Sequence, residues 1–391
     1  MSKKNRNQDV ELLDEELVPA EKPRKKKKKK KGSGVLGRII RRFFLLLFTI
    51  VILAAAALVL VMNMVFNGPS PAAQEVLTMS LIEASATKWV PALFIGEERV
   101  AEIRANVSAE LPDELTDTSQ VVIQKGNVLS STNDEWANYP DGIRIERYAG
   151  DTYNAHIMIV RDPSQVYMGT SSEKFSVNIP GKRITEMMDA NPDAIAAVNA
   201  GAFFDDGTAG SAVGSYPLGL VVSGGNVVWT QGKQPGLEGF AGFNKDDILV
   251  VSKKNLSQKE AQEQGIRDGC CFGPVLLMNG EVNMEAYNNN SGFNPRTAIG
   301  QRKDGAVIFV CIDGRQAGSL GGTYADIIHI MVEYKAYNAC NMDGGSSSVM
   351  MYRDTRGLFG EAGQVQMINN YSLLQSQPRR MPNFWMVRAA G

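Results

Sequence analysis

An uninterrupted apolar run near the N-terminus constrains this chain more than any other feature. Phe43 to Met62 consists of Phe, Leu, Ile, Val, Ala and Met, with Thr49 as the single polar residue and no charge. A helix rises about 1.5 Å per residue, so this run matches a bilayer core roughly 30 Å thick. It is longer than the apolar part of a secretory signal and follows a largely polar segment of 42 residues. We expect an uncleaved transmembrane helix over residues 43–64, with a cleaved signal as the alternative.

Basic residues are concentrated on one side of this run. Residues 1–42 hold 15 Lys and Arg against 6 Asp and Glu, whereas the remaining 349 residues hold 26 against 36. The positive-inside rule therefore predicts a single-pass protein of the cell membrane with a cytoplasmic N-terminus and an extracytoplasmic C-terminal domain. We interpret residues 1–42 as a disordered tail whose lysines 25–31 touch anionic lipid headgroups. Nucleic-acid binding is disfavoured because no aromatic residues alternate with these lysines.

The sequence beyond the apolar run falls into two parts. We interpret residues 65–142 as a stalk or lid, with a helix expected from Gln74 to about Lys88, mixed sequence from Trp89 to about Asp141, and a strand-like run at 121–124. Residues 143–391 are rich in alternating and β-branched segments. Strands are expected at 143–148, 155–161, 166–169, 193–198, 218–222, 226–229, 296–300, 306–312, 338–342 and 384–387, and helices at 184–190 and 323–334. This pattern predicts a mixed β-sheet domain with flanking helices, of the α+β or α/β class.

The cysteines and histidines disfavour several kinds of site. Four cysteines are too few for a disulfide scaffold, and Cys311 and Cys340 lie in apolar runs typical of buried strands. We expect free core thiols, with a bridge between these two as the alternative. His156 and His329 are far apart in the sequence, which favours neither a histidine-rich metal site nor a Ser-His-Asp triad. The sequence requires no cofactor and leaves a divalent metal open, since residues 205–207 (Asp-Asp-Gly) suit either Ca²⁺ or a plain acidic turn.

Three apolar segments end abruptly in polar residues and glycine. They are residues 196–204 (AAVNAGAFF), 307–315 (VIFVCIDGR) and 339–348 (ACNMDGGSSS). A buried strand that ends in this way holds a polar group rigidly at a sheet edge, where glycine lets a ligand approach the backbone. Turn chemistry explains one such end equally well. Three in one domain, with Arg296 and Arg315 nearby in the sequence, point to a binding or catalytic site.

The order and spacing of these segments resemble the phosphodiester glycosidase family. This family includes the catalytic domain of N-acetylglucosamine-1-phosphodiester α-N-acetylglucosaminidase and bacterial exopolysaccharide-associated proteins. The resemblance covers roughly residues 150–390 and rests on Asn199–Phe204, Arg296–Gly300, Asp313–Arg315 and Asn341–Ser348. Ser346 stands where a third glycine is common, and the segment at Asn199 is a variant of an Asn-Gly-Gly-aromatic-Phe pattern. The resemblance implies hydrolysis of a sugar-1-phosphodiester at the anomeric carbon.

The implied reaction suggests a role for each residue. A phosphate monoester is a good leaving group, so the reaction has little need of a general acid. It still needs a carboxylate, as nucleophile or to activate water, and cations to hold the phosphate. We expect Asp343 to be the catalytic carboxylate, and Asp313 to be either a second one or the partner that orients an arginine. The expected substrate-binding residues are Arg296, Arg315, Asn199, Gly201, Gly344, Gly345 and Ser346.

Structural alternatives stand beside these roles. Arg296 could instead form a buried ion pair with Asp313 or Asp343, and Asn199 could cap the end of its strand. A nucleophilic role for one of the serines 346–348 is disfavoured because the sequence offers no evident general base.

Three functions remain open on the sequence alone. The first is a membrane-anchored extracytoplasmic hydrolase that cleaves a sugar-phosphate glycoconjugate or exopolysaccharide of the cell envelope. The second is a non-catalytic module that binds anionic polysaccharide and assists its assembly. The third is a glycosyl transferase of exopolysaccharide biosynthesis. A carboxylate that turnover requires would separate the enzymes from the binding module.

The distribution of basic residues makes the topology testable. Protease added to intact cells or protoplasts should digest the chain from Gln74 onward and spare the lysine-rich tail, as read by antibodies against each part. A digested tail beside a protected C-terminal domain would show the opposite orientation. Leu53→Arg should disfavour membrane insertion by about 3 kcal/mol, because it places a charge at the centre of the span.

Overall fold

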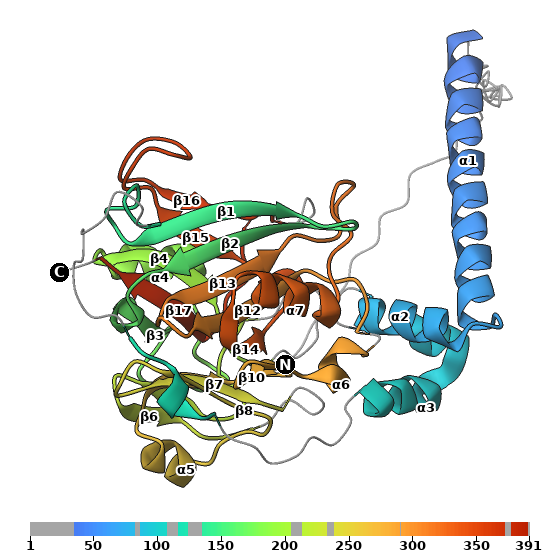
Figure 1. Ribbon diagram of the computed structural model, residues 1–391. Coiled ribbons are helices and arrows are strands. Elements are labelled where there is room, and N and C mark those ends of the chain that lie inside the picture. The colour runs from blue at the N-terminus through green and yellow to red at the C-terminus, as the bar shows by residue number, and fades with distance from the viewer. Residues whose placement is uncertain are drawn as a thin grey trace, which may run out of the picture. The chain divides into compact units, whose positions relative to one another are not determined.

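The computed structural model describes residues 35–82, 87–107, 116–123, 135–204, 213–232, 238–289, 291–371 and 377–389 (Figure 1). The chain divides into two compact units, Met1–Val59 and Leu60–Gly391. The second unit contains all of the described strands and the candidate site.

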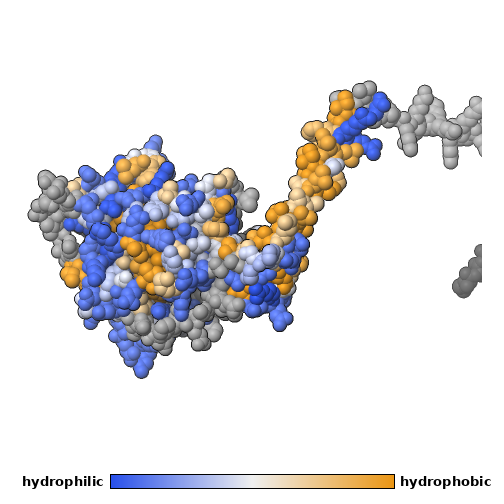
Figure 2. Space-filling model, turned by 45° about the vertical axis from the view of Figure 1, so that its right-hand side comes forward, coloured by the Kyte–Doolittle hydropathy of each residue, from blue (hydrophilic) through white to orange (hydrophobic). Residues whose placement is uncertain are grey.

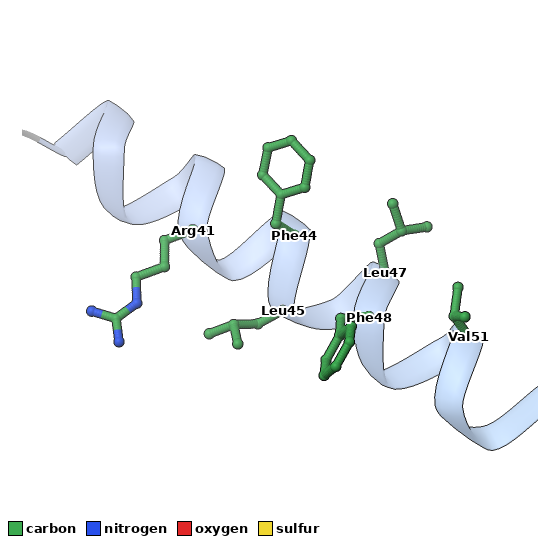
Figure 3. A pocket seen from close by; sticks show the side chains of 6 residues that line it. All are labelled: Arg41, Phe44, Leu45, Leu47, Phe48 and Val51. Atoms are coloured by element: carbon green, nitrogen blue, oxygen red, sulfur yellow. The ribbon is translucent and has the colours of Figure 1, made fainter. Parts of the chain in front are cut away.

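The expected apolar helix is present as α1 (Val35–Phe66). Its segment Gly37–Phe66 is long and apolar enough to cross a membrane, and most of its apolar side chains between Ile39 and Met64 are exposed (Figure 2). The helix is therefore a candidate membrane span or signal sequence. A shallow hollow on its surface is lined by Arg41, Phe44, Leu45, Leu47, Phe48 and Val51 (Figure 3). Because α1 alone supplies every side chain that lines it, we interpret this hollow as ordinary helix surface.

Two helices follow α1. Helix α2 (Pro71–Ile82) begins three residues before the expected start at Gln74. Helix α3 (Val90–Val107) corrects the expectation of mixed sequence there. Proline is tolerated in a first helical turn, so Pro91 does not prevent α3, and Gly96 (φ 76°) forms a kink between its two helical parts. The expected strand at 121–124 is absent over its described residues, which follow the short 3₁₀ turn η1 (Thr118–Gln120).

A seven-stranded antiparallel sheet forms the first layer of the domain. Its order is β1 (Ile143–Ala149), β2 (Asn154–Val160), β13 (Val307–Ile312), β12 (Arg296–Arg302), β14 (Ala336–Met342), β10 (Val275–Met278) and β11 (Glu281–Val282). Helix α7 (Tyr324–Glu333) covers one face, where Ile327, Ile330 and Met331 pack in one core cluster with the sheet (Figure 1). Thr323 and Asp326, spaced as a pair that typically caps a helix start, hydrogen-bond to each other's backbone N–H at the start of α7.

Two five-stranded antiparallel sheets complete the domain. The second sheet has the order β16 (Val365–Met367), β15 (Met350–Arg353), β4 (Ala194–Asn199), β17 (Asn383–Arg388) and β3 (Val166–Thr170). The third has the order β6 (Asn226–Trp229), β5 (Val221–Ser223), β9 (Ile266–Cys271), β7 (Phe240–Asn244) and β8 (Leu249–Ser252). Phe309, Trp385 and Phe243, one from each sheet, are fully buried in the same cluster. A shared core of this kind joins the three sheets.

The α+β expectation is confirmed. Short helices α4 (Ile184–Ala190), α5 (Gln258–Glu263) and α6 (Met284–Tyr287) and the turns η2 (Pro163–Gln165) and η3 (Gly345–Ser347) complete the described elements. The expected strands of the domain are all present, with ends shifted by up to three residues. Sequence reasoning missed β7 to β11 and β15 and β16. Strands β7 and β9 are buried on both faces and carry glycine and polar residues, so they lack a two-residue alternation.

The four cysteines are free and buried, as expected. Cys311 on β13 lies opposite Thr297, and Cys340 on β14 lies opposite Ile299, so β12 separates the two thiols. Two strand spacings amount to roughly 9.5 Å, beyond the Cα separation of about 7 Å that a disulfide tolerates. The alternative of a Cys311–Cys340 bridge is therefore wrong.

Candidate active site

The three strand ends that the sequence singled out meet at one edge of the domain. In the first sheet, Arg296 lies opposite Ile312 and Thr297 lies opposite Met342. The residues that follow those two partners, Asp313 and Asp343, therefore flank the start of β12. Strand β4 of the second sheet ends at the same place, because the Asp343 N–H donates to the Ala200 carbonyl at 3.0 Å.

Asn199 joins the two sheets at this edge. Its Oδ1 accepts hydrogen bonds from the Thr297 hydroxyl (2.9 Å) and the Val349 N–H (3.0 Å), and its Nδ2 donates to the Asp343 carbonyl (2.6 Å). Asn199 is fully buried. Both ends of its amide are used within the protein, which favours the strand-end role over contact with a sugar. We assign Asn199 as the residue that positions Asp343.

The loop after Asp343 is packed tightly against the start of β12. Gly345 has a φ of 62°, a conformation that favours glycine, and its N–H donates to the Pro295 carbonyl at 2.8 Å. A Cβ on Gly344 would lie 2.9 Å from the same oxygen. The Gly345 N–H is thus bound within the protein and is not offered to a ligand, contrary to the expectation. The glycines here permit close backbone packing, and Asp343 at the start of the loop is partly exposed.

Gly201 is likewise used for packing. Its N–H donates to Asn383 Oδ1 at 2.7 Å, and a Cβ at this position would lie 2.9 Å from both the Cys270 Cβ and the Cys271 carbonyl oxygen. Gly201 was expected to contact substrate. In the structure it allows the segment after β4 to approach strand β9 closely.

Asp313 forms a buried cluster with a histidine and an asparagine. Its Oδ2 lies 3.1 Å from His156 Nε2 and accepts from Asn370 Nδ2 at 2.7 Å, while its Oδ1 accepts from the Asn370 N–H at 2.8 Å. Asp313 is 2% exposed. Its carboxylate ties β2 of the first sheet to the segment after β16 of the second. These contacts favour a positioning role over that of a second catalytic carboxylate, and they involve no arginine.

No pattern in the sequence indicates the Asp313–His156 pairing. Cross-strand register brings His156 beside Cys311, two residues before Asp313, and that register is visible only in the folded sheet. His156 Nδ1 is buried and has no hydrogen-bond partner among the residues that the structure describes.

Arg296 is held on the α7 side of the sheet. Its Nε donates to the Gly322 carbonyl at 3.1 Å, and one terminal nitrogen donates to the carbonyls of Ser291 (2.7 Å) and Gly292 (3.1 Å). Its guanidinium lies 4.4 Å from the ring centroid of Tyr324. Arg296 is 2% exposed, and it contacts backbone carbonyls and an aromatic ring. From the sequence we expected it to bind the phosphate, with an ion pair to an aspartate as the alternative.

Arg315 is an exposed arginine at the same edge. It has a left-handed backbone conformation (φ 58°), and one of its terminal nitrogens donates to Asn294 Oδ1 at 2.6 Å. Asn294 directly precedes Pro295, whose carbonyl holds Gly345. Arg315 thus lies near the Asp343 loop, and its role in substrate binding stays a prediction.

Sequence reasoning missed a second arginine, Arg379. One of its terminal nitrogens donates to Ser346 Oγ at 3.2 Å, and its guanidinium lies 4.9 Å from the ring centroid of Phe203. Its backbone N–H donates to the Tyr371 hydroxyl, which itself donates to the Ser346 carbonyl. No motif marks Arg379, and its one local signal is a pair of arginines shortly before the last strand.

Electrostatics connect Arg379 with Asp343. Burial raises the pKa of the Tyr371 phenol above its ordinary value, Arg379 lowers it, and the negative charge of Asp343 raises it again. The tyrosine is therefore neutral at pH 7 and able to donate its proton to the Ser346 carbonyl. Arg379 and Asp343 thus influence the pKa of the same phenol in opposite directions.

Two remaining expectations concern serines and a metal. Ser347 and Ser348 are buried, and their hydroxyls have no hydrogen-bond partner within the described part of the chain. A serine nucleophile would need a general base. The histidine of this region, His156, contacts Asp313. Residues 205–207, considered for Ca²⁺, lie outside the described residues. Within the described ranges no cluster of three or more His, Cys, Asp or Glu residues could hold a metal.

Comparisons with known proteins point to one family. The sequence model of the family described as phosphodiester glycosidase matches residues 192–388, half of the chain. An uncharacterized SPbeta prophage-derived protein of Bacillus subtilis, YomE, is 23% identical over 192 residues. That alignment covers 48% of this chain and 27% of YomE, so the chain spans about a quarter of its curated relative.

Two solved structures are similar at low identity. The zebrafish N-acetylglucosamine-1-phosphodiester α-N-acetylglucosaminidase catalytic domain, auto-inhibited by its pro-peptide, is 20% identical with a TM-score of 0.49. The match covers 72% of this chain and 89% of that one. An exported protein from Burkholderia pseudomallei K96243 is 14% identical with a TM-score of 0.41, over 60% of this chain and 74% of that one.

The surroundings of Arg296 predict a loss of stability when it is replaced. Arg296→Lys keeps the charge but loses the planar group that reaches three carbonyls and the Tyr324 ring, so the free energy of unfolding should fall by about 2–4 kcal/mol. Exposed Arg315→Lys, the matched control, should change it by less than about 0.5 kcal/mol. Thermal unfolding of the full chain in detergent, followed by circular dichroism, measures both. An Arg296→Lys protein of normal stability but reduced turnover would return Arg296 to the role of a substrate ligand.

Proposed function

This chain belongs to the phosphodiester glycosidase family, and we propose that it hydrolyses a sugar-1-phosphodiester. One observation carries the proposal. Asp343, partly exposed at the end of the buried strand β14, begins the loop in which the Ser346 hydroxyl accepts from Arg379, and Arg315 lies at the same edge. A carboxylate beside cations on a rigid sheet edge suits a reaction at the anomeric carbon of an anionic sugar ester.

In the proposed reaction, the bond between the anomeric carbon and the phosphate oxygen breaks. Water supplies the new hydroxyl on the sugar, and the electron pair of the broken bond leaves with the phosphate monoester. Asp343 either takes a proton from the attacking water or attacks the carbon first and is released by water in a second step. Because the leaving phosphate is already a stable anion, no second carboxylate has to protonate it, which agrees with the buried position of Asp313.

We assign phosphate binding to Arg379 and Arg315. Arg379 is partly exposed and reaches the Asp343 loop through Ser346, and Arg315 reaches it through Asn294 and Pro295. A planar guanidinium offers two parallel donors to two phosphate oxygens. Arg296, bound to carbonyls beneath the edge, supports the site from below. The proposed binding loop also includes Gly344 and Ser346. The Ser346 hydroxyl accepts a hydrogen bond from Arg379.

The proposed setting is the outer face of a membrane. We propose that α1 anchors the chain, that its N-terminal side is cytoplasmic, and that the domain acts on a sugar-phosphate glycoconjugate or exopolysaccharide of the cell envelope. The single apolar helix and the basic residues before it support this arrangement. The partners are then a membrane and an anionic glycan, with no nucleic acid.

Replacing Asp343 tests the catalytic assignment. Asp343→Asn should lower kcat by about 10²–10⁴-fold, because the amide is nearly isosteric but lacks charge and basicity, while the melting temperature stays close to that of the parent chain. The measurement is single-turnover release of free sugar from a panel of sugar-1-phosphodiesters. Asp313→Asn, the matched control, should mainly lower the melting temperature, because it disturbs the buried contacts to His156 and Asn370. Normal turnover in folded Asp343→Asn would instead move the catalytic role to Asp313.

Replacing Arg379 tests the phosphate assignment. Arg379→Gln should raise KM for the phosphodiester by about 10–100-fold, as expected for the loss of a charge-assisted contact, with a smaller change in kcat. The neighbouring Arg380 pairs with Glu186 at 2.8 Å, so Arg380→Gln serves as a control of equal charge change. Equal effects of the two variants on KM would show that Arg379 contributes only to the overall positive potential and does not contact the phosphate directly.

A further inference from the structure

Four aromatic side chains form a column beside the candidate site. Phe204 and Tyr216 are stacked, with ring centroids 4.9 Å apart and planes inclined by 8°. The Tyr216 and Trp229 centroids are 5.5 Å apart, and Phe175 meets Trp229 edge to face at 5.7 Å. Phe204 is 40% exposed, whereas Phe175 at the other end is buried. The column therefore ends in one exposed ring that three others hold in place.

Backbone pairing determines which way the two adjacent phenylalanines point. Phe203 forms an antiparallel bridge with Pro217, and the Phe204 N–H donates to the Tyr216 carbonyl at 3.0 Å. Successive residues of an extended segment face opposite sides. Phe203 accordingly lies in the core beneath Arg379, and Phe204 lies outside, on Tyr216.

The exposed ring lies a short way along the chain from the proposed chemistry. Phe204 follows Phe203, Phe203 contacts Arg379, and Arg379 donates to Ser346 in the loop that begins at Asp343. Two exposed valines, Val177 and Val213, belong to the segments that adjoin the column. The Val177 carbonyl accepts from the Ser215 hydroxyl, and the Val213 carbonyl accepts from the Gly181 N–H. Apolar surface thus borders a site assigned to an anionic sugar ester.

A rigid aromatic face of this kind suits a pyranose ring. One face of a pyranose presents C–H groups, and the face of an aromatic ring carries partial negative charge that attracts them. The surface is preorganised, because the stacked Tyr216 restrains the orientation of Phe204 before any ligand arrives. The roles assigned to Asp343, Arg379 and Arg315 do not use this ring, which leaves it for a further sugar of a longer substrate.

We propose that Phe204, supported by Tyr216 and Trp229, is a stacking subsite for a pyranose ring of a glycan chain that carries the scissile phosphodiester. The inference rests on the proposed hydrolase function and narrows its substrate to oligosaccharide or polysaccharide phosphodiesters. A glycan chain would then lie with its phosphate at Arg379 and a neighbouring sugar on Phe204.

Paired substrates test the subsite on the full chain in detergent. For each sugar that is turned over, kcat/KM is measured with the methyl phosphodiester and with the same sugar phosphate linked to a tetrasaccharide. Phe204→Leu, which keeps apolar volume but removes the ring, should lower the tetrasaccharide-to-methyl ratio of kcat/KM by about threefold to tenfold. Phe204→Tyr should restore that ratio. Phe359→Leu, at a phenylalanine of similar exposure outside the column, should leave it unchanged.

A binding measurement separates this inference from the proposed function. Calorimetry with neutral hexasaccharides (α-glucan, β-glucan and chitin-derived) needs no turnover, and at least one should bind the parent chain and bind Phe204→Leu more weakly. Such binding without hydrolysis of any phosphodiester would uphold the subsite and overturn the hydrolase. Turnover with equal kcat/KM for both substrates, and no binding of any hexasaccharide, would overturn the subsite and uphold the hydrolase. An equal loss on both substrates in Phe204→Leu would also overturn the subsite, because it would mean that the ring supports the loop.

Discussion

The site depends on one buried amide, that of Asn199. It bonds the first sheet at Thr297, the second sheet at Val349, and the backbone of Asp343. An unpaired buried amide costs about 1–3 kcal/mol, so these groups must keep their relative positions for the fold to persist. Asn369 and Asn370 act in the same way nearby, the first on Met350 and Ser348, the second on Asp313. Asparagine side chains at this edge replace the ladder bonds that the strands no longer make.

Burial divides the charged residues of the edge into two groups. Arg296 and Asp313 are almost inaccessible, and each has its charge balanced by carbonyls, amides or a ring. Arg315 is exposed, and Arg379 and Asp343 are partly exposed. Moving a charge out of water costs several kcal/mol unless fixed dipoles replace the water. The buried pair therefore stiffens the edge, and the accessible group comprises the residues to which we assign substrate binding and catalysis.

The same support extends to the segment after α1. The Phe293 N–H donates to the Ser80 hydroxyl of α2 at 3.0 Å, and Phe293 follows the two carbonyls that hold Arg296. A Cβ on Gly292 would lie 2.5 Å from the Ser80 hydroxyl oxygen, so the two segments fit closely. Helix α2, which we expected to belong to a stalk, thus supports the loop beneath the candidate site. On another side of that site, the aromatic column is connected to it through Phe203 and Arg379.

Sequence and tertiary structure determined different parts of this protein. Local pattern was enough for the apolar helix, the alternating strands from residue 143, the α7 cap and the three polar strand ends, because periodicity and capping act over a few residues. Helix α3 was not predicted from the local pattern, because Pro91 and Gly96 interrupt its helical periodicity. The roles of the charged residues needed the fold. Asp313 meets a histidine 157 positions away, and Arg379 meets Ser346 across 33. Which arginine is buried and which stays accessible depends on partners that only folding brings together.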